Sequence, residues 1–116
     1  VTVISADPDR IGQALSILVD NALSYTPAPG GVTIGIQTFE KKLRFFVSDT
    51  GPGVPDGEKQ QIFQRFHRSE AARSDRKHFG LGLSIAAEIA AAHQGRLWVE
   101  DAPGGGAVFF LELPRP

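Results

Sequence analysis

The chain has 116 residues, of which 41% are hydrophobic, which is enough for one compact domain with a single core but too little for two. Its 12 lysines and arginines nearly balance its 13 aspartates and glutamates, and a net charge of -1 gives no long-range attraction for nucleic acid or an anionic membrane. The absence of cysteine excludes disulfides and thiolate metal sites, and no stretch approaches the roughly 20 apolar residues that would span a bilayer.

The first half of the chain predicts one long helix followed by two strands. Asp7 or Asp9 can cap a helix in which apolar residues recur at helical spacing until Pro27 and a Pro-Gly-Gly turn end it. Apolar residues then alternate with small or polar ones over residues 32–36 and again over 43–47, on either side of a Glu-Lys-Lys turn. We therefore expect an antiparallel hairpin after the helix.

The second half predicts two further helices and a second hairpin. Residues 55–66 suggest a short helix, and residues 67–79 are polar, basic and without period, as expected of a loop. Residues 80–95 open on glycines, carry strong helix formers and close with Gly95 as the expected C-cap. Strand patterns in RLWVE and AVFFLELP flank a Pro-Gly-Gly-Gly turn. The predicted fold is α+β: a two-layer sandwich with a mixed, mostly antiparallel sheet covered on one face by about three helices.

Asp49 ends the second expected strand and is followed by Thr-Gly-Pro-Gly. Side chains alternate along a strand, so Asp49 shares its face with Leu43, Phe45 and Val47 and is expected to point toward the core. A buried carboxylate without a partner is costly, so a pocket that supplies a donor, such as the adenine amino group or an ordered water, would satisfy it. The alternative is that Asp49 only caps the turn as an Asx residue.

Asp-Thr-Gly after an apolar strand is also the mark of retroviral-type aspartic proteases, in which two chains bring their carboxylates together. Such enzymes are nearly all strand, whereas residues 9–26 and 82–94 are strongly helical by pattern and propensity. The helices therefore favour a ligand pocket over a protease.

Four blocks occur in one order: LSILVDNALSYTP, DTGPGVP, IFQRFHRS and GLGLSIA. They resemble the N, G1, F and G2 boxes of the catalytic ATP-binding domain of bacterial two-component sensor histidine kinases, in the ATPase/kinase superfamily with the Bergerat fold. The resemblance covers nearly the whole chain. It implies that the domain binds Mg-ATP and presents the γ-phosphate for transfer to a histidine on a separate dimerisation and phosphoacceptor domain.

The resemblance also assigns roles within the four blocks. Asn21 would hold the Mg²⁺ that bridges the phosphates, Tyr25 would line the nucleotide site, and Asp49 would bind the adenine amino group. Glycines before a helix expose N–H groups that attract phosphate, and the basic side chains of the F box are candidate phosphate contacts. No side chain is expected to be catalytic. The expected ATP-binding residues are Asn21, Tyr25, Asp49, Gly51, Gly53, Val54, Arg65, Arg68, Gly80, Leu81, Gly82 and Leu83.

Each of these assignments has a plainer alternative. Asn21 could be a surface or capping residue, Tyr25 a core residue with a solvated hydroxyl, and Arg65 and Arg68 solvated cations. Glycines before a helix are often only a turn, although in the G1 block Gly51 and Gly53 would also let the backbone approach the adenine closely.

Three positions depart from the family pattern. Ile17 stands where these kinases commonly have a second Asn, Ser24 where they often have Lys, and His78 where the G2 box usually begins with Gly. We expect these changes to weaken binding at the metal and phosphate end without abolishing adenine binding. Ile17 also stands where ATP-hydrolysing members have the Glu that activates water, so hydrolysis by that route is not expected.

The resemblance finally sets the expected context. No histidine here is followed by an acid, so the acceptor histidine, the dimer contacts and any sensor part are expected before Val1, and residues 1–116 form one domain of a longer kinase. The expected partners are the kinase's own acceptor domain and, through it, a response regulator, with neither nucleic acid nor direct membrane contact. The parent is expected to be a homodimer anchored in the bacterial inner membrane, with this domain in the cytoplasm. The alternatives are an anti-sigma-factor serine kinase and a nucleotide-binding docking module without catalysis.

Overall fold

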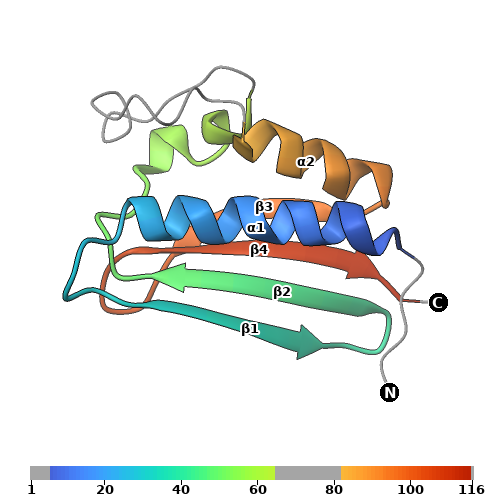
Figure 1. Cartoon of the computed structure of the whole chain (residues 1–116), viewed down its shortest axis with the longest axis horizontal. Coiled ribbons are helices and arrows are strands. Elements are labelled where there is room, and N and C mark those ends of the chain that lie inside the picture. The colour runs from blue at the N-terminus through green and yellow to red at the C-terminus, as the bar shows by residue number, and fades with distance from the viewer. Residues whose placement is uncertain (1–5, 65–81, 116) are drawn as a thin grey trace.

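The structure is a computed structural model that describes residues 6–64 and 82–115. Two α-helices lie on one face of a sheet, and the sheet ends nearest the β1–β2 and β3–β4 turns mark the two ends of the molecule (Figure 1). No helix among these residues has both the length and the apolar character needed to cross a bilayer. The elements are α1 (Pro8–Ser24), β1 (Val32–Thr38), β2 (Lys42–Asp49), two single-turn 3₁₀ helices, η1 (Asp56–Glu58) and η2 (Gln61–Phe63), α2 (Gly82–Ala92), β3 (Arg96–Asp101) and β4 (Ala107–Pro114).

The sheet has the strand order β1-β2-β4-β3, and each pairing between these described strands is antiparallel. Both predicted hairpins form, and β2 and β4 pair in the centre of the sheet. Val47 lies opposite Ile34 on one side and opposite Phe109 on the other, so these three side chains share the face that the helices cover. The predicted two-layer α+β class is confirmed.

The helix α1 begins where the sequence predicts. The carboxylate of Asp7 accepts hydrogen bonds from the backbone N–H groups of Asp9 (3.0 Å) and Arg10 (3.3 Å), which satisfies donors that a helix start leaves unpaired. A proline in the first helical turn suits this position because its missing N–H would have no partner there. The buried face of α1 then carries Ile11, Ala14, Leu18 and Ala22 at helical spacing.

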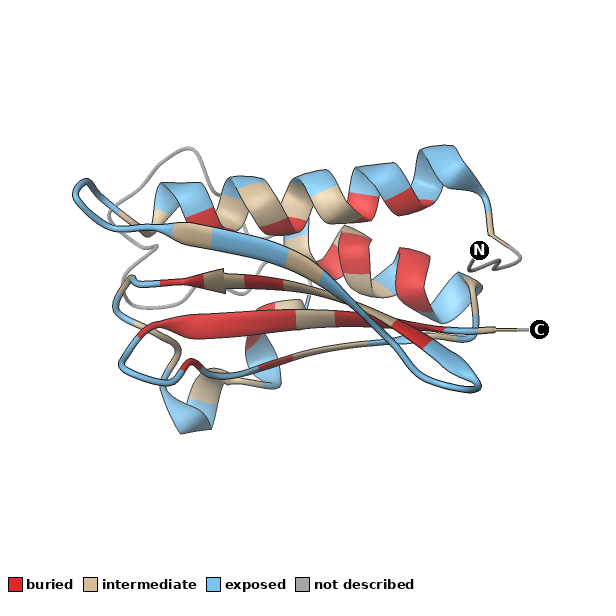
Figure 2. Ribbon diagram, turned by 90° about the horizontal axis from the view of Figure 1, so that it is seen from below, coloured by how far each residue is buried: buried red, intermediate tan, exposed pale blue. Residues whose placement is uncertain are grey.

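The core lies between the helices and the central strands, and β4 is buried along most of its length (Figure 2). Phe109 and Leu111 of β4, Val47 of β2, Leu18 of α1 and Ile89 of α2 are all essentially inaccessible to solvent. Because these residues come from both helices and both central strands, burying them fixes the helix layer on the sheet.

Two sequence predictions about helices are corrected. Where one short helix was expected over residues 55–66, the described part contains the two 3₁₀ turns η1 and η2. Gly95 was expected to be the C-cap of the following helix, but the left-handed residue there is Gln94, with φ of 59°. The N–H of Gly95 donates to the carbonyl of Ala90 (2.8 Å), and the N–H of Gln94 donates to the carbonyl of Ala91 (3.0 Å). This is the Schellman motif, in which Gln94 is the left-handed residue and Gly95 is the residue that follows it.

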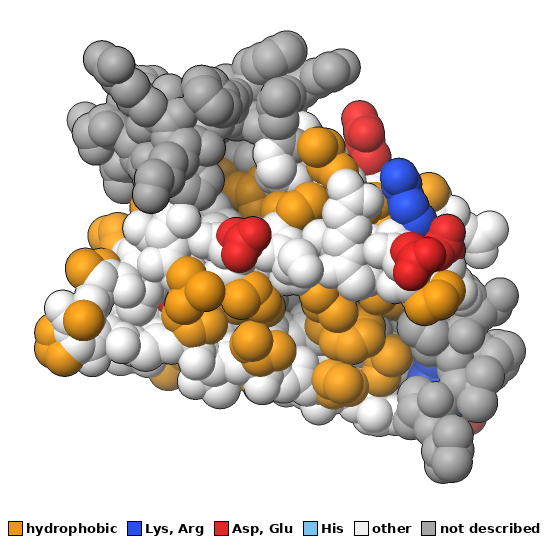
Figure 3. All heavy atoms as spheres, viewed as in Figure 1, with side chains coloured by type: hydrophobic (Ala, Val, Ile, Leu, Met, Phe, Trp, Pro, Cys, Tyr) orange, Lys and Arg blue, Asp and Glu red, His pale blue; other side chains and the backbone are white. Residues whose placement is uncertain are grey.

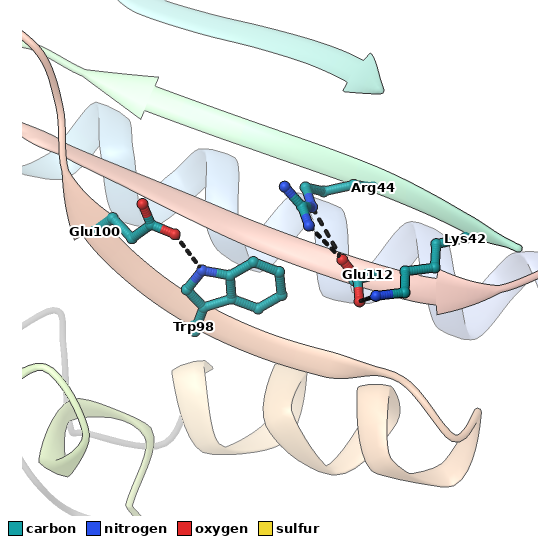
Figure 4. A network of polar contacts seen from close by, with 5 residues as sticks. All are labelled: Lys42, Arg44, Trp98, Glu100 and Glu112. Atoms are coloured by element: carbon teal, nitrogen blue, oxygen red, sulfur yellow. Dashed lines mark hydrogen bonds and ion pairs between the residues drawn. The ribbon is translucent and has the colours of Figure 1, made fainter. Parts of the chain in front are cut away.

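On the sheet face without helices, charged and aromatic side chains of neighbouring strands contact one another (Figure 4). Arg44 donates from Nε (3.0 Å) and Nη2 (2.7 Å) to one carboxylate oxygen of Glu112, which is only 6% exposed. The guanidinium also lies 4.8 to 5.5 Å from the ring centres of Phe39, Trp98 and Phe110. A nearly buried carboxylate thus keeps its charge partner, and removing either member of the pair would be strongly destabilising.

On the helix side, by contrast, apolar side chains reach solvent along the sheet beside α1 (Figure 3). Ile34 and Ile36 of the edge strand β1 are 58% and 59% exposed, and Leu23 near the end of α1 is 59% exposed. The helix layer therefore covers the central strands and leaves the edge strand β1 largely exposed to solvent.

We predict that two leucines on the same helix differ sharply in their contribution to stability. Leu18→Ala empties a fully buried position and should lower the free energy of unfolding by about 2–5 kcal/mol. Leu23→Ala is the matched control, because its side chain is mostly exposed, and should cost less than about 1 kcal/mol. Urea unfolding of both variants measures the difference, and equal losses would contradict the position of α1 on the sheet.

Candidate functional site

The end of the molecule where α1 finishes also holds the turn after β2, the 3₁₀ turns and the start of α2 (Figure 1). Two hydrogen bonds join the segment between α1 and β1 to the turn after β2. Gly31 donates its N–H to the hydroxyl of Thr50 (2.9 Å), and Thr50 donates its N–H to the carbonyl of Gly31 (3.1 Å). These hydrogen bonds hold the segment that follows the first sequence block beside the second block.

Asp49 lies at the centre of this end and is 5% exposed. Its Oδ1 accepts hydrogen bonds from the backbone N–H of Gly51 (2.9 Å) and from that of Ala107 at the start of β4 (3.2 Å). The bond to Gly51 is the Asx contact that the plainer interpretation predicted, and the bond to Ala107 adds a second, distant donor. Within the described residues, no hydrogen bond reaches Oδ2. One oxygen thus fixes the carboxylate, and the other remains available as an acceptor.

Gly51 is required by packing inside the protein. A Cβ at this position would overlap the carbonyl of Tyr25, the residue that caps the end of α1. The sequence predicts that a ligand approaches this glycine closely, and the contact described here is with the end of α1. Tyr25 and Asp49 are consequently held in adjacent segments, as the nucleotide-site assignment requires.

Gly106 lies against the backbone of Asp49. It has φ of 92°, and a Cβ there would overlap the backbone carbonyl of Asp49. Its own carbonyl accepts the N–H of Ala102 (3.0 Å) across the β3–β4 turn and lies 3.2 Å from where a Cβ of Gly53 would be. Two loops far apart in the sequence therefore pack backbone against backbone around Asp49.

The helices contribute the remaining described residues. Asn21 is half-buried, and its amide makes no hydrogen bond to the residues described here, so its oxygen is available to a ligand. Ile17, one turn earlier, has its Cγ2 3.5 Å from the position of a Cβ on Gly82, the first residue of α2. The methyl group that replaces the family's second Asn thus faces the helix start that is expected to hold phosphate. Val54 and Leu83 are partly buried and pack against the core.

Arg65, Arg68, Gly80 and Leu81 lie outside the described residues, as do His67 and His78. Among the residues that are described, no three His, Cys, Asp or Glu side chains are grouped to hold a metal ion. A magnesium ion at Asn21 would therefore find no group of further acidic or histidine ligands in the described part of the chain. Phosphate and water are the usual ligands of this ion beside nucleotides.

Lys59, which lies directly after η1, is not among the site residues predicted from the sequence. Its ammonium donates to the carbonyl of Val54 (3.0 Å), pairs with Asp101 (3.0 Å) at the end of β3, and forms a short contact with Asp56. The hydrogen bond and charge of Lys59 lower the pKa of Asp56, and the bonds to Asp56 and then Asp101 raise the pKa of Lys59, so both groups are charged at neutral pH. No sequence motif marks this lysine, because its partners come from two segments that lie far apart in the sequence, residues 54–56 and Asp101.

These features define the class of protein as a two-layer α+β domain with a candidate ligand site around Asp49. Comparison with known proteins supplies the family. Residues 6–116 match the family described as histidine kinase-, DNA gyrase B- and HSP90-like ATPase. The adaptive-response sensory kinase SasA of Nostoc sp. (strain PCC 7120) is 41% identical over 112 residues, or 96% of this chain. The chain belongs to this ATPase family, and within it to the ATP-binding catalytic domains of histidine kinases.

Solved structures agree with this assignment. The mycobacterial sensor histidine kinase MprB matches with a TM-score of 0.88 and 33% identity, covering 97% of this chain and 78% of that one. Full-length ShkA in complex with AMPPNP matches with a TM-score of 0.83 and 34% identity, covering 99% of this chain and 23% of that one. ThkA in complex with the response regulator TrrA matches with a TM-score of 0.80 and 33% identity, covering 97% and 30%. The chain spans 28% of the length of the SasA relative.

We predict that Gly106→Ala destabilises the domain more than Gly104→Ala. Both residues have positive φ, so both substitutions strain the backbone, but an added Cβ collides with the Asp49 carbonyl only at position 106 and meets open space at position 104. The difference in the free energy of unfolding should be about 1–3 kcal/mol, measured by urea denaturation. Equal losses at the two positions would contradict the close packing of the β3–β4 turn on Asp49.

Proposed function

We propose that this domain binds Mg-ATP at the end that holds Asp49 and presents the γ-phosphate to a histidine on a separate dimerisation and phosphoacceptor domain. The observation that carries the proposal is the half-satisfied carboxylate of Asp49. It is buried, its Oδ1 is held by two backbone N–H groups, and its Oδ2 has no partner in the described part of the chain. An adenine amino group is a donor of the kind that such an oxygen requires.

The phosphate end of ATP would lie toward the helices. Backbone N–H groups at the start of α2 and the amide of Asn21 on α1 supply a donor surface and a metal ligand respectively. Mg²⁺ held there would neutralise phosphate charge, and Ile17 adds no second ligand beside it. We therefore propose that adenine contacts contribute more to affinity in this domain, and metal contacts less, than in relatives with Asn at position 17.

Transfer itself requires positioning and charge neutralisation more than a reactive side chain. We assign no nucleophile or general base to this chain. The attacking imidazole would come from the acceptor domain of the full-length kinase, and from there the phosphate would pass to a response regulator. The neighbour ThkA, solved with the response regulator TrrA, supports a partner of that kind. We propose that the full-length protein is a homodimer in which this domain faces the cytoplasm, where ATP is available.

Asp49→Asn is predicted to abolish nucleotide binding while the fold survives. An Asn side chain keeps Oδ1 as acceptor for Gly51 and Ala107 but replaces Oδ2 with an N–H₂ donor, which opposes the adenine amino group. The affinity for ATP, measured by calorimetry, should fall more than about 100-fold. Asp9→Asn, an exposed change at the other end of α1, is the matched control and should leave affinity unchanged. Unchanged ATP affinity in a folded Asp49→Asn domain would defeat the proposal.

Phosphotransfer is predicted only when the acceptor domain of the full-length kinase is added to this domain with γ-labelled ATP. The label on the acceptor should be lost in acid and retained in alkali, because phosphohistidine is acid-labile and phosphoserine is not. Acid-stable label on a serine would instead show the anti-sigma-factor type of kinase. Tight ATP binding without transfer to any acceptor would show a docking module.

A further inference from the structure

Lys59 makes more contacts than an ordinary surface lysine. Its side chain is only 19% exposed, whereas those of Asp56 and Asp101 are 92% and 71% exposed. Its ammonium donates to the Val54 carbonyl as well as to both carboxylates, so all three of its donors have an acceptor. An isolated surface ion pair contributes little, but an ammonium held by three groups at the junction of two loops restrains the loops.

These contacts join the two loops that pack around Asp49. Val54 ends the turn that follows Asp49, and Asp101 ends β3 just before the β3–β4 turn. From Asp101 the chain leads through Ala102, whose N–H donates to the Gly106 carbonyl, to Ala107, whose N–H holds Asp49 Oδ1. Lys59 thus connects the segment that supplies one donor to Asp49 with the segment that supplies the other.

We propose that Lys59 is a positioning residue for nucleotide binding, which sets the orientation of the Asp49 carboxylate by clamping Val54 to Asp101 without touching the nucleotide. The inference rests on the proposed ATP-binding function. Without the ammonium, the two acidic side chains would repel each other and the β3–β4 turn would be free to move away from Asp49.

The test measures the affinity of the 116-residue chain for ATP by calorimetry, well below the unfolding temperature of each variant. Lys59→Met keeps the aliphatic stem and removes the charge, and should weaken binding about tenfold. Lys42→Met is the matched control, because Lys42 pairs with Glu112 on the opposite sheet face at 3.7 Å, and it should leave affinity unchanged. Asp101→Asn, a change to an exposed side chain, should weaken binding in the same direction and serves if Lys59→Met fails to fold.

A double-mutant cycle separates positioning from general stability. If Lys59 acts through Asp101, Lys59→Met combined with Asp101→Asn should bind ATP no more weakly than Lys59→Met alone. A nucleotide-free measurement accompanies it: amide hydrogen exchange of Gly51 and Ala107, the two donors to Asp49, should accelerate about tenfold in Lys59→Met while the amides of β1 and β2 keep their rates.

The outcomes are distinguishable. A wild-type chain that binds ATP and a Lys59→Met variant within twofold of it would overturn the role of Lys59 and leave the proposed function standing. If the losses of affinity in the double variant are additive, the proposed action of Lys59 through Asp101 is overturned and the proposed function stands. A wild-type chain that does not bind ATP would overturn the proposed function, and unchanged exchange at Gly51 and Ala107 would then also exclude any ordering role for Lys59.

Discussion

The arrangement of this domain depends on the burial of one carboxylate at the end of a central strand. A carboxylate buried there requires hydrogen-bond donors, and its Oδ1 accepts two backbone N–H groups, one from its own turn and one from the start of β4. That requirement brings the β3–β4 turn against the turn after β2 so closely that Gly106 has no room for a side chain. The remaining oxygen, Oδ2, accepts no hydrogen bond from the described residues, so a donor on a ligand placed there would be its partner.

Most of the fold could be predicted from the sequence because local signals and burial agree. The apolar spacing of α1, its Asp7 cap and the alternation in both hairpins each indicated the element that the structure shows. The exceptions lie where a tertiary contact overrides a local preference. Gln94 rather than Gly95 adopts the left-handed conformation. The segment expected to be one helix forms two 3₁₀ turns, the second of which buries Ile62 in the core.

The candidate site was predictable only where a side chain carries the chemistry. Strand parity alone indicated that Asp49 faces inward, and the structure confirms its burial. Contacts made by backbone atoms have no comparable signal in the sequence. Any residue at position 107 would supply the same backbone N–H, and the run of glycines that includes Gly106 suggested only a turn. Lys59 pairs with Asp101, which is 42 residues further along the chain (101 minus 59). Such contacts require the register of the sheet to be known.

A hydrogen bond also joins the two helices at the end of the molecule opposite Asp49, between the start of α1 and the end of α2. His93, just past the end of α2, has Nδ1 at 2.8 Å from the Ile89 carbonyl, so that nitrogen carries the proton, and Nε2 accepts the N–H of Asp7 (3.1 Å) at the start of α1. Further along, Ile17 in the middle of α1 lies close to Gly82, the first residue of α2. Sliding one helix along the other would break the imidazole contact, so this hydrogen bond opposes a change in the register of the two helices.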